Sequence, residues 1–409
     1  MNILQINKFY FLNGGSEQCI FSLIDLLEKN NHHVIPFSMK HSQNFESPHE
    51  TYFVNNVDYN ATATGYLQKI KTGLKALYSI EAQKKMHALL TSNRPDIAHI
   101  HNFNYQLTSS ILSPLKQRNI PVVQTLHDYH MICPSHNLYD FEGMQICEDC
   151  CNGGFFNAVK RKCLKGSAMT SLIGALEGYL AEFLHVYTQK IDGFICPSLF
   201  LKNKMVAHGL APQKVIHIPN FVDPEAFEPQ YKGMNYLVYF GRLEKFKGIH
   251  TLIEAFKTIR DAELYVLGDG SLKSSLKDEV NKHKMDHVRI LGFKTGKQLT
   301  DIIRHSLCTV IPSEWYENNP LSVLESFAIG KPVIGSDIGG IPELIQQEET
   351  GLLFEPGNSE DLSKTIQYCL NRKTSLEAMG RRARERIEKQ FTPAMHYQKT
   401  IDFYHEMRQ

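Results

Sequence analysis

The sequence predicts an α/β protein with two domains, each built on a parallel, doubly wound sheet. The chain has 409 residues, which is enough for two or three domains. Its composition, 42% hydrophobic and 21% charged, is that of ordinary globular proteins. Short apolar runs alternate with helical stretches in both halves, and a polar, proline-containing segment, 220–234, separates the halves.

Apolar runs that alternate with helical stretches predict the strands of two parallel sheets. A helix over 249–260 follows the first strand of the second set, and a long amphipathic helix is expected within 167–187. We therefore expect a first domain at 1–220 and a second at 221–387. The predicted strands are 2–10, 33–38, 95–101, 121–127 and 193–197 in the first domain, and 236–241, 263–268, 288–292, 308–312 and 332–336 in the second.

The net charge of +1 at pH 7 argues against nucleic acid as a partner, because binding to a phosphate backbone normally needs a clear basic excess. Residues 1–6 have a strand pattern without a basic leader or a cleavable apolar segment, so we expect a cytoplasmic protein. The longest apolar stretch, 167–187, contains Glu177 and Glu182, which makes it a poor membrane span. We expect it to pack on the core, with an interfacial location as the alternative.

Two carboxylates, Glu317 and Glu325, lie on either side of a predicted helix start. Asn319 is expected to cap this helix, Pro320 to occupy its first position and Gly330 to follow its last turn. The free amides and the positive end of the helix dipole suit a phosphate, and the carboxylates can accept hydrogen bonds from hydroxyls beside it. A nucleotide sugar has this layout, with a diphosphate between the sugar and the ribose.

Two cations follow the first predicted strand of the second half. The strand 236–241 ends at Gly241, and Arg242 and Lys247 come next, before the helix 249–260. Open α/β sheets bind ligands at the carboxyl ends of their strands. Arg242 can fork to phosphate oxygens and Lys247 adds a point charge, so both suit the negative charge that develops on a leaving diphosphate.

These motifs, in this order, resemble the retaining family 4 glycosyltransferases of the GT-B fold, of the bacterial surface-polysaccharide type. The resemblance also includes the loop 14–17, the pair His127-Asp128 and the interdomain segment 218–223, and it covers nearly the whole chain. It implies two Rossmann-like domains that face each other across a cleft, with the last helix, 388–409, packing back on the first domain. The sequence departs from the family at 318–320, where many relatives carry a glycine-rich run.

The resemblance implies a role for each site residue. Glu325 is placed against the ribose hydroxyls and Glu317 against those of the sugar, while His127 orients the sugar or stabilises developing positive charge. Gly14 and Gly15 let backbone amides approach the donor, and Ser16 is expected to cap the helix that follows. The expected catalytic residues are His127, Arg242, Lys247 and Glu317, and the expected donor-binding residues are Gly14, Gly15, Gly241, Asn319, Pro320, Leu321 and Glu325.

The resemblance also implies the reaction. We expect a transfer from a nucleotide-diphosphate sugar to a glycan or a lipid-linked oligosaccharide in the biosynthesis of cell-surface polysaccharides. No cofactor is expected to be required, and the sequence has no Asp-x-Asp motif that asks for a metal. No nucleophile is assigned, because retention in such enzymes is explained by the leaving phosphate taking the acceptor's proton on the same face.

Two other functions stay open. A nucleotide-sugar epimerase with the same two-domain layout would turn over without an acceptor. A non-catalytic nucleotide-sugar-binding protein would lack the phosphate cations, whereas Arg242 and Lys247 are both present. A dinucleotide dehydrogenase is disfavoured, because the first strand leads to Asn13-Gly14-Gly15-Ser16 instead of a Gly-x-Gly-x-x-Gly turn.

Five of the nine cysteines cluster within 133–163 and include a Cys-x-x-Cys pair. In a cytosolic protein such a cluster favours a metal over disulfides. A structural zinc ion is therefore one interpretation, and free thiols or a disulfide or redox pair are the others. The expected zinc ligands are Cys133, Cys147, Cys150 and Cys163.

The segment 62–93 has a basic amphipathic pattern, with Lys69, Lys71 and Lys75 among leucines and isoleucines. Such a pattern indicates either a solvated helix pair on the first domain or a face that rests on anionic lipid. The resemblance adds weight to the second interpretation, because many relatives act on lipid-linked acceptors. The protein would then be peripheral on the inner face of the plasma membrane.

Overall fold

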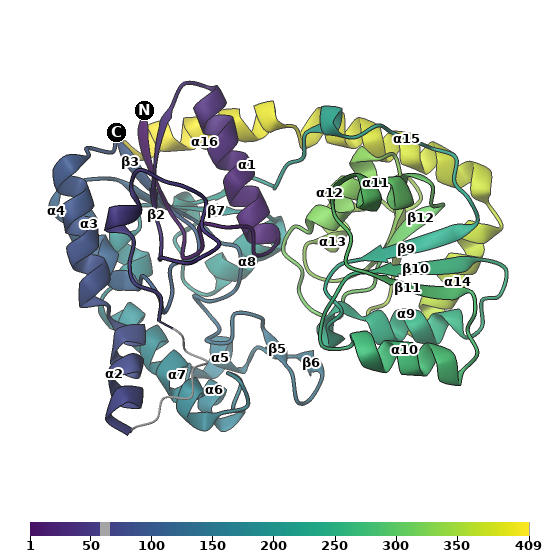
Figure 1. The fold of residues 1–409 in the computed structure, drawn as a ribbon, viewed down its shortest axis with the longest axis horizontal. Helices are drawn as coiled ribbons and strands as arrows, with labels where there is room; N and C mark the ends of the chain where they lie inside the picture. Colours follow the sequence, from purple (N-terminus) through teal and green to yellow (C-terminus); the bar gives the residue numbers. More distant parts are fainter. Residues whose placement is uncertain (58–65, 409) are drawn as a thin grey trace. The chain divides into compact units, whose positions relative to one another are not determined.

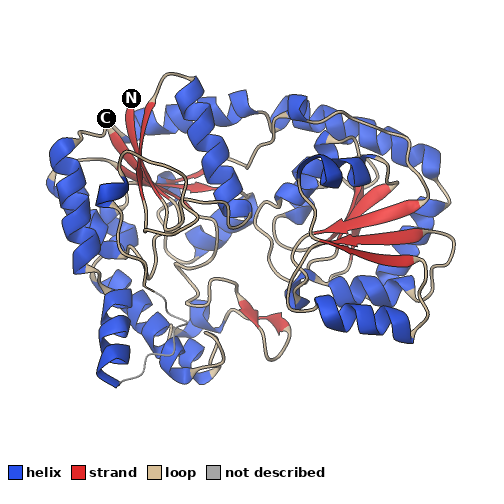
Figure 2. Ribbon diagram, in the orientation of Figure 1, coloured by secondary structure: helices blue, strands red, loops and turns tan. Residues whose placement is uncertain are grey.

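The computed structural model describes residues 1–57 and 66–408, and their side chains except those of 66–71. The chain divides into two compact units. Unit 1 comprises Met1–Leu138, Cys147–Ile218 and Tyr397–Gln409, and unit 2 comprises Tyr139–Ile146 and Pro219–His396. Each unit contains a parallel sheet surrounded by helices, as Figure 2 shows. The predicted α/β class, with a Rossmann-like doubly wound sheet in each half, is confirmed.

Unit 1 contains a six-stranded parallel sheet in the order β2-β1-β3-β4-β7-β8. Three of its central strands are buried along their whole length, as expected for strands that are covered on both faces. Ile3 of the first strand lies opposite Val34 on one side and Ile97 on the other. The strands are β1 (Asn2–Ile6), β2 (His33–Phe37), β3 (Ile97–Ile100), β4 (Val122–Thr125), β7 (Gly193–Cys196) and β8 (Val215–His217).

Helices cover the sheet of unit 1 (Figure 1). The last one, α16 (Pro393–Met407), drawn in yellow, brings Ile401, Phe403 and Tyr404 into one core with Ile3 and Ile97 of the sheet. Much of this helix therefore completes the hydrophobic core of unit 1. The other helices are α1 (Gly15–Lys29), α2 (Tyr66–Leu77), α3 (Ile80–Ser92), α4 (Leu112–Gln117), α5 (Asp149–Gly153), α6 (Asn157–Lys160), α7 (Ala168–Phe183) and α8 (Leu199–Ala207).

Unit 2 contains a second six-stranded parallel sheet, in the order β11-β10-β9-β12-β13-β14. Its core includes Leu237, Val266 and Val310 from three neighbouring strands, each fully buried. Its strands are β9 (Tyr236–Phe240), β10 (Glu263–Leu267), β11 (Val288–Gly292), β12 (Cys308–Ile311), β13 (Val333–Ser336) and β14 (Gly351–Phe354). Its helices are α9 (Ile249–Phe256), α10 (Lys273–Lys282), α11 (Gly296–Arg304), α12 (Leu321–Ala328), α13 (Ile341–Leu344), α14 (Ser359–Leu370) and α15 (Lys373–Gln390).

A glycine sets the close approach of two loops in unit 2. Gly248 has φ +67° and precedes α9, and a Cβ atom on it would lie 1.7 Å from the carbonyl oxygen of Pro312. Only glycine fits there, because it has no Cβ and adopts positive φ without strain. The loop after β9 is therefore held against the loop after β12, where the predicted site residues lie.

Each predicted strand overlaps an observed one, but the sequence analysis missed β8 and β14. Both are edge strands, and β8 has only three residues before Pro219 interrupts the pattern. A further difference is a small antiparallel hairpin, β5 (Tyr139–Asp140) with β6 (Gln145–Ile146). It groups with unit 2, so the first unit is not continuous over 1–220 as expected.

Candidate functional site

In unit 2, two residues that the sequence identified separately form an ion pair. Lys247 Nζ lies 2.6 Å from Glu317 Oε1, and Ser313 Oγ donates to the same carboxylate oxygen at 2.6 Å. Lys247 follows β9 and Glu317 follows β12, two neighbouring strands of the sheet. Because parallel strands end at the same edge, the two loops meet where such sheets bind ligands.

The carboxylate of Glu317 is held in its ionised form. Glu317 is only 7% exposed, and burial alone raises its pKa. The charge of Lys247 and the hydrogen bonds from Lys247 and Ser313 outweigh burial, so the pKa of Glu317 is lowered below its ordinary value. The two hydrogen bonds hold this buried carboxylate in place, so it is suited to orienting a ligand that donates to it.

Aromatic rings lie beside both predicted phosphate cations. Lys247 Nζ lies 4.9 Å from the ring centroid of Trp315, and the guanidinium carbon of Arg242 lies 5.7 Å from that of Phe246. The rings of Phe246 and Trp315 have centroids 4.8 Å apart. These distances are within the range of cation–π attraction. The sequence analysis missed Phe246 and Trp315, although Trp315 is the single tryptophan of the chain.

Arg242 keeps its positive charge available. Its side chain is exposed, and no residue within the described ranges forms an ion pair with its guanidinium. Its position is fixed through the backbone, because Tyr239 Oη donates to the carbonyl oxygen of Arg242 at 2.7 Å. An anion at the end of β9 would therefore meet a guanidinium without a competing carboxylate.

The start of α12 differs from the prediction. The helix begins at Leu321, after Pro320, and Asn319 does not cap it. Asn319 Oδ1 instead accepts the backbone N–H of Asn220 at 3.2 Å, and the carbonyl oxygen of Asn319 accepts from Asn220 Nδ2 at 2.8 Å. This loop is therefore tied to the segment that follows unit 1 in the sequence. Glu325 lies one turn into α12 and is half-buried.

A second glycine contact fixes the backbone of Glu317. Gly340 N–H donates to the carbonyl oxygen of Glu317 at 2.7 Å, and a Cβ on Gly339 would lie 2.5 Å from that oxygen. Gly339 has φ +61°, which also favours glycine. The Gly-Gly pair was the signal in the sequence that could have identified this support.

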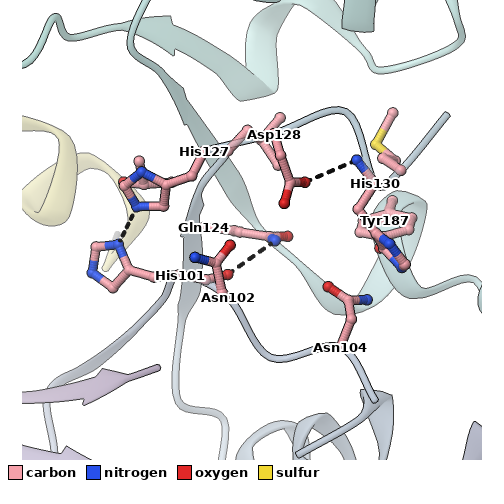
Figure 3. Close-up of a pocket in the computed structure, with 11 residues that line it drawn as sticks. His101, Asn102, Asn104, Gln124, His127, Asp128, His130 and Tyr187 are labelled. Carbon is pink, nitrogen blue, oxygen red and sulfur yellow. Dashed lines mark hydrogen bonds between the residues drawn. The ribbon is translucent and has the colours of Figure 1, made fainter. Parts of the chain in front are cut away.

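In unit 1, a small pocket lies at the carboxyl ends of β3 and β4, and His127 lines it (Figure 3). His101 Nδ1 lies 2.9 Å from His127 Nε2, and His101 Nε2 lies 2.9 Å from Gln5 Oε1. Because Gln5 Oε1 can only accept, a neutral His101 donates to it and accepts from His127 Nε2–H. The lining residues are His101, Asn102, Asn104, Gln124, Thr125, Leu126, His127, Asp128, His130, Met131 and Tyr187.

His127 is neutral at physiological pH. Burial lowers its pKa to about 4, although the neighbouring Asp128 acts in the opposite direction. With Nε2–H donated to His101, its Nδ1 remains as an acceptor. A neutral imidazole can orient a hydroxyl group without adding a charge to the pocket.

Beside His127, four side chains form a hydrogen-bonded series that begins at the partly exposed Asp128 and ends at the buried Glu177. Asp128 Oδ2 lies 3.1 Å from His136 Nδ1, and His136 Nε2 lies 3.1 Å from His130 Nδ1. His130 Nε2 then lies 2.7 Å from Glu177 Oε2, on α7. Each carboxylate accepts from one imidazole, so the two rings share a single extra proton between them.

The pKa values of the two histidines in this series are shifted in opposite directions. Burial lowers the pKa of His130, but Glu177 and Asp128 outweigh it and raise the pKa above 6.5. Burial and the charge of His130 lower the pKa of His136. Burial raises the pKa values of Asp128 and Glu177, but the histidines outweigh it and lower both. The shifts thus favour protonation of His130 over His136, and the sequence analysis did not predict this network.

The loop before α1 also differs in detail from the prediction. The helix begins at Gly15, and Ser16 does not cap it, since its Oγ donates to Glu17 Oε2 at 3.1 Å. Gly14 is extended, and a Cβ on it would meet nothing nearer than Glu17 Oε2 at 3.7 Å. Packing within unit 1 therefore does not require glycine at position 14.

The cysteine cluster gives the predicted zinc site no support. None of the nine cysteines forms a disulfide, and no group of three or more His, Cys, Asp or Glu among the described residues could hold a metal ion. Burial and the neighbouring Cys133 raise the pKa values of Cys150 and Cys151 to about 12, which favours thiols over the thiolates that zinc binds. The zinc ion stays a prediction, which metal analysis of the purified protein decides.

Two family models match consecutive parts of the chain. The model of Glycosyltransferase Family 4 matches residues 13–226, and that of Glycosyl transferases group 1 matches residues 224–386. The first match alone covers half of the chain. Together they include the predicted site residues of both units.

Curated relatives carry related names. The chain is 29% identical over 224 residues to an uncharacterized glycosyltransferase of Methanocaldococcus jannaschii, an alignment that covers 54% of this chain and 61% of that protein. It is 25% identical over 358 residues to a glycogen synthase of Mycobacterium tuberculosis, which covers 85% of this chain and 75% of the synthase.

Solved structures share the fold over almost the whole chain. A sucrose-phosphate synthase from Thermosynechococcus elongatus superposes with a TM-score of 0.72 at 18% identity, covering 99% of this chain and 98% of that one. Anabaena HepE in complex with UDP-glucose superposes with a TM-score of 0.68 at 16% identity, covering 98% of each. The chain belongs to glycosyltransferase family 4 and is a glycosyltransferase of the GT-B fold.

Proposed function

We propose that the chain is a retaining glycosyltransferase that needs no metal and moves a sugar from a nucleotide-diphosphate sugar to a hydroxyl group of a glycan or a lipid-linked oligosaccharide. The ion pair between Lys247 and Glu317, with the unpaired Arg242 beside it, carries this proposal. Arg242 is exposed and forms no ion pair with a described residue, so the site suits an anion with hydroxyl groups attached. Cell-surface polysaccharide biosynthesis is the process we propose for it.

In the proposed reaction, the bond between the anomeric carbon and the β-phosphate oxygen breaks, and the acceptor oxygen bonds to that carbon on the same face. The acceptor's proton passes to the leaving phosphate oxygen, so the products are a glycoside and a nucleoside diphosphate. Arg242 and Lys247 stabilise the charge that builds on the leaving phosphate. Preorganised charges of this kind typically contribute about 3 kcal/mol each.

The other site residues position the donor in this proposal. Glu325 accepts hydrogen bonds from the ribose, and Glu317 accepts one from the sugar, because its carboxylate is ionised and buried. Neutral His127 accepts through Nδ1 from a sugar hydroxyl. Gly14 and Gly241 leave room for the donor, and the α12 N terminus adds backbone amides.

Nucleotide binding tests this proposal. UDP, GDP and ADP are each added to the purified protein, and the melting temperature is measured; the solved Anabaena HepE complexes contain UDP, UDP with glucose, and UDP-glucose. We expect one nucleotide to stabilise the wild type, and Arg242→Ala and Glu325→Ala to lose that shift. Arg289→Ala is the control, because Arg289 is an exposed arginine of unit 2 that pairs with Glu263 on the neighbouring strand. No shift with any nucleotide would contradict the proposal.

The alternative of an epimerase is tested separately. The nucleotide sugar that corresponds to the stabilising nucleotide is incubated with the protein without an acceptor, and the sugar is analysed by NMR. A transferase leaves the sugar unchanged or hydrolyses it slowly. Release of a new sugar at the rate of the complete reaction would favour the epimerase.

We propose an anionic membrane surface as a partner of unit 1. On α7, the exposed side chains of Met169, Leu176, Tyr179 and Phe183 recur at helical spacing, and exposed lysines precede the helix. An amphipathic helix of this kind can lie in a lipid interface. The predicted basic residues Lys69 and Lys71 lie where side chains are not described.

Vesicle flotation tests the membrane contact. No helix among the described residues has the length and the apolar character needed to cross a bilayer, so the contact is expected to be interfacial. Phosphatidylglycerol vesicles should carry the protein upward more than phosphatidylcholine vesicles do. Phe183→Glu should reduce flotation, whereas Met234→Glu, at an exposed apolar position of unit 2, should not. Equal flotation with both lipids would count against the proposal.

A further inference from the structure

The β5–β6 hairpin is an unexpected part of unit 2. It lies in the sequence between Leu138 and Cys147, which belong to unit 1, and Cys147 N–H closes its base by donating to the carbonyl oxygen of Leu138 at 2.9 Å. Figure 1 shows it at the tip of an excursion from the chain between β4 and α5. An eight-residue segment, Tyr139–Ile146, that groups with another unit needs a reason in that unit.

Two aromatic side chains of the hairpin, Tyr139 and Phe141, contact Phe246 of the candidate site. The ring of Phe141 lies edge-on to that of Phe246 at a centroid distance of 5.7 Å, and Tyr139 lies 6.3 Å from Phe246. Tyr139 and Phe141 also contact each other at 5.4 Å. Phe246 continues this series to Trp315. Edge-to-face pairs at these distances add stability and fix ring orientation.

Phe246 is a ring that both phosphate cations contact. It lies between Arg242 and Lys247 in the sequence, and both cations lie over its ring, at 5.7 Å and 5.9 Å from the centroid. The face that a ring presents to a cation depends on its orientation, because only the face is negative. The orientation of the Phe246 ring therefore contributes to the positions of the two cations, together with the ion pair between Lys247 and Glu317.

The hairpin is held by a side-chain hydrogen bond near its turn and by the pairing of its two short strands. Asp140 Oδ1 accepts the backbone N–H of Glu142 at 3.0 Å, and Tyr139 pairs with Ile146 across the two short strands. Tyr139 is 1% exposed, whereas Phe141 is 41% exposed. Phe141 can thus be replaced with little effect on the core, which makes it the residue of choice for a test.

We propose that the hairpin Tyr139–Ile146 is a donor-positioning element, in which Phe141 and Tyr139 hold the ring of Phe246 and thereby place Arg242 and Lys247 for the diphosphate. This inference rests on the proposed function. It assigns positioning residues for the donor to a segment that the chain supplies from the middle of its first half.

The test compares a nucleoside diphosphate with its nucleoside. The probe is whichever of UDP, GDP and ADP stabilises the wild type most, and its affinity and that of the matching nucleoside are measured by calorimetry. We expect Phe141→Ala to weaken diphosphate binding about fivefold and to leave nucleoside binding unchanged, because only the phosphates meet the cations. Phe141→Tyr should restore the affinity. Phe156→Ala, which removes an exposed ring from unit 1, is the matched control.

Each outcome of the binding measurements supports or overturns the proposed role of the hairpin. Unchanged diphosphate binding in Phe141→Ala, at an unchanged melting temperature, would overturn the inference. An equal loss for diphosphate and nucleoside would also overturn it, since that pattern reports general loosening. If Phe141→Ala unfolds, Phe141→Leu supplies the same comparison. A wild type that binds none of the three diphosphates removes the proposed function first, before any variant is made.

Discussion

Lys247 Nζ lies 2.6 Å from Glu317 Oε1, although 70 residues separate the two in the sequence. The carboxylate is buried, so removing its cation leaves a charge in a medium that solvates it poorly. We expect Lys247→Met to lower the free energy of unfolding by about 3 kcal/mol, as in other buried pairs that lose one partner. Urea unfolding of the purified variant measures it.

A double variant separates stability from catalysis at this pair. Adding Glu317→Gln to Lys247→Met removes the buried charge, so part of the lost stability should return. Transfer activity should stay low in both, because the leaving phosphate lacks its cation. An active double variant would show that Lys247 serves the fold alone.

Gly14→Ala should leave unit 1 folded and impair transfer. The backbone at Gly14 is extended, and a Cβ would meet nothing nearer than 3.7 Å, so the melting temperature should change little. If the donor approaches this backbone, a methyl group lies in its way and the KM for the nucleotide sugar should rise. Thermal unfolding measures the melting temperature, and titration with the nucleotide sugar measures the KM. An unchanged KM would remove Gly14 from the donor site.

The chain Asp128–His136–His130–Glu177 should make stability depend on pH in both directions. The pKa of His130 is raised in the folded protein, so its contribution is complete below its unfolded pKa and is lost as the pH rises through the folded value. The pKa of Glu177 is lowered, so its contribution is present above its unfolded pKa and is lost as the pH falls through the folded value.

Urea unfolding between pH 4 and pH 9 measures this dependence. Tyr105 contacts the rings of both histidines, Tyr105 and Tyr187 both interact with Glu177 and Asp128, and Lys8 lowers the pKa values of His130 and His136. Glu177→Gln should flatten the alkaline limb, because His130 loses the carboxylate that holds its proton. A variant with the pH profile of the wild type would show that Glu177 does not raise the pKa of His130.

Tyr139→Phe should stabilise unit 2. The hydroxyl of Tyr139 is buried, and no described residue provides it with a hydrogen-bond partner. Removing an unpaired buried hydroxyl relieves a desolvation cost of about 1 kcal/mol. Thermal unfolding measures the change, with Tyr236→Phe as the control, since Tyr236 Oη donates to the carbonyl oxygen of Ile302 and should lose stability instead.

Much of the fold could be predicted because its signals are local. The buried run 236–240 is a strand pattern on its own, and the two phosphate cations follow it directly. The hairpin could not be predicted, because its four paired residues have no periodicity and it groups with a unit that is distant in the sequence. The partner of Asn319 could not be predicted either, since Asn220 lies 99 residues away.

The candidate site shows the same limit. Glycine pairs and isolated charges identified the loops, but the pairing of Lys247 with Glu317 depends on β9 and β12 being neighbours, which order along the chain does not reveal. The histidine network depends on Glu177 of α7, which lies 47 residues after His130 in the sequence. Sequence patterns thus located the residues, and the fold determined which of them touch.

The helix α16 has a consequence for synthesis on the ribosome. Its Tyr404 is fully buried in unit 1 and lies within hydrogen-bond distance of His99, yet it follows every residue of unit 2 in the chain. Most of unit 1 is translated first, but its core stays incomplete until α16, which follows unit 2, has been translated. All residues of unit 2 have been translated before that point. The half that is made first is therefore the half that is finished last, and a nascent chain must keep the surface that α16 will cover away from other proteins in the meantime.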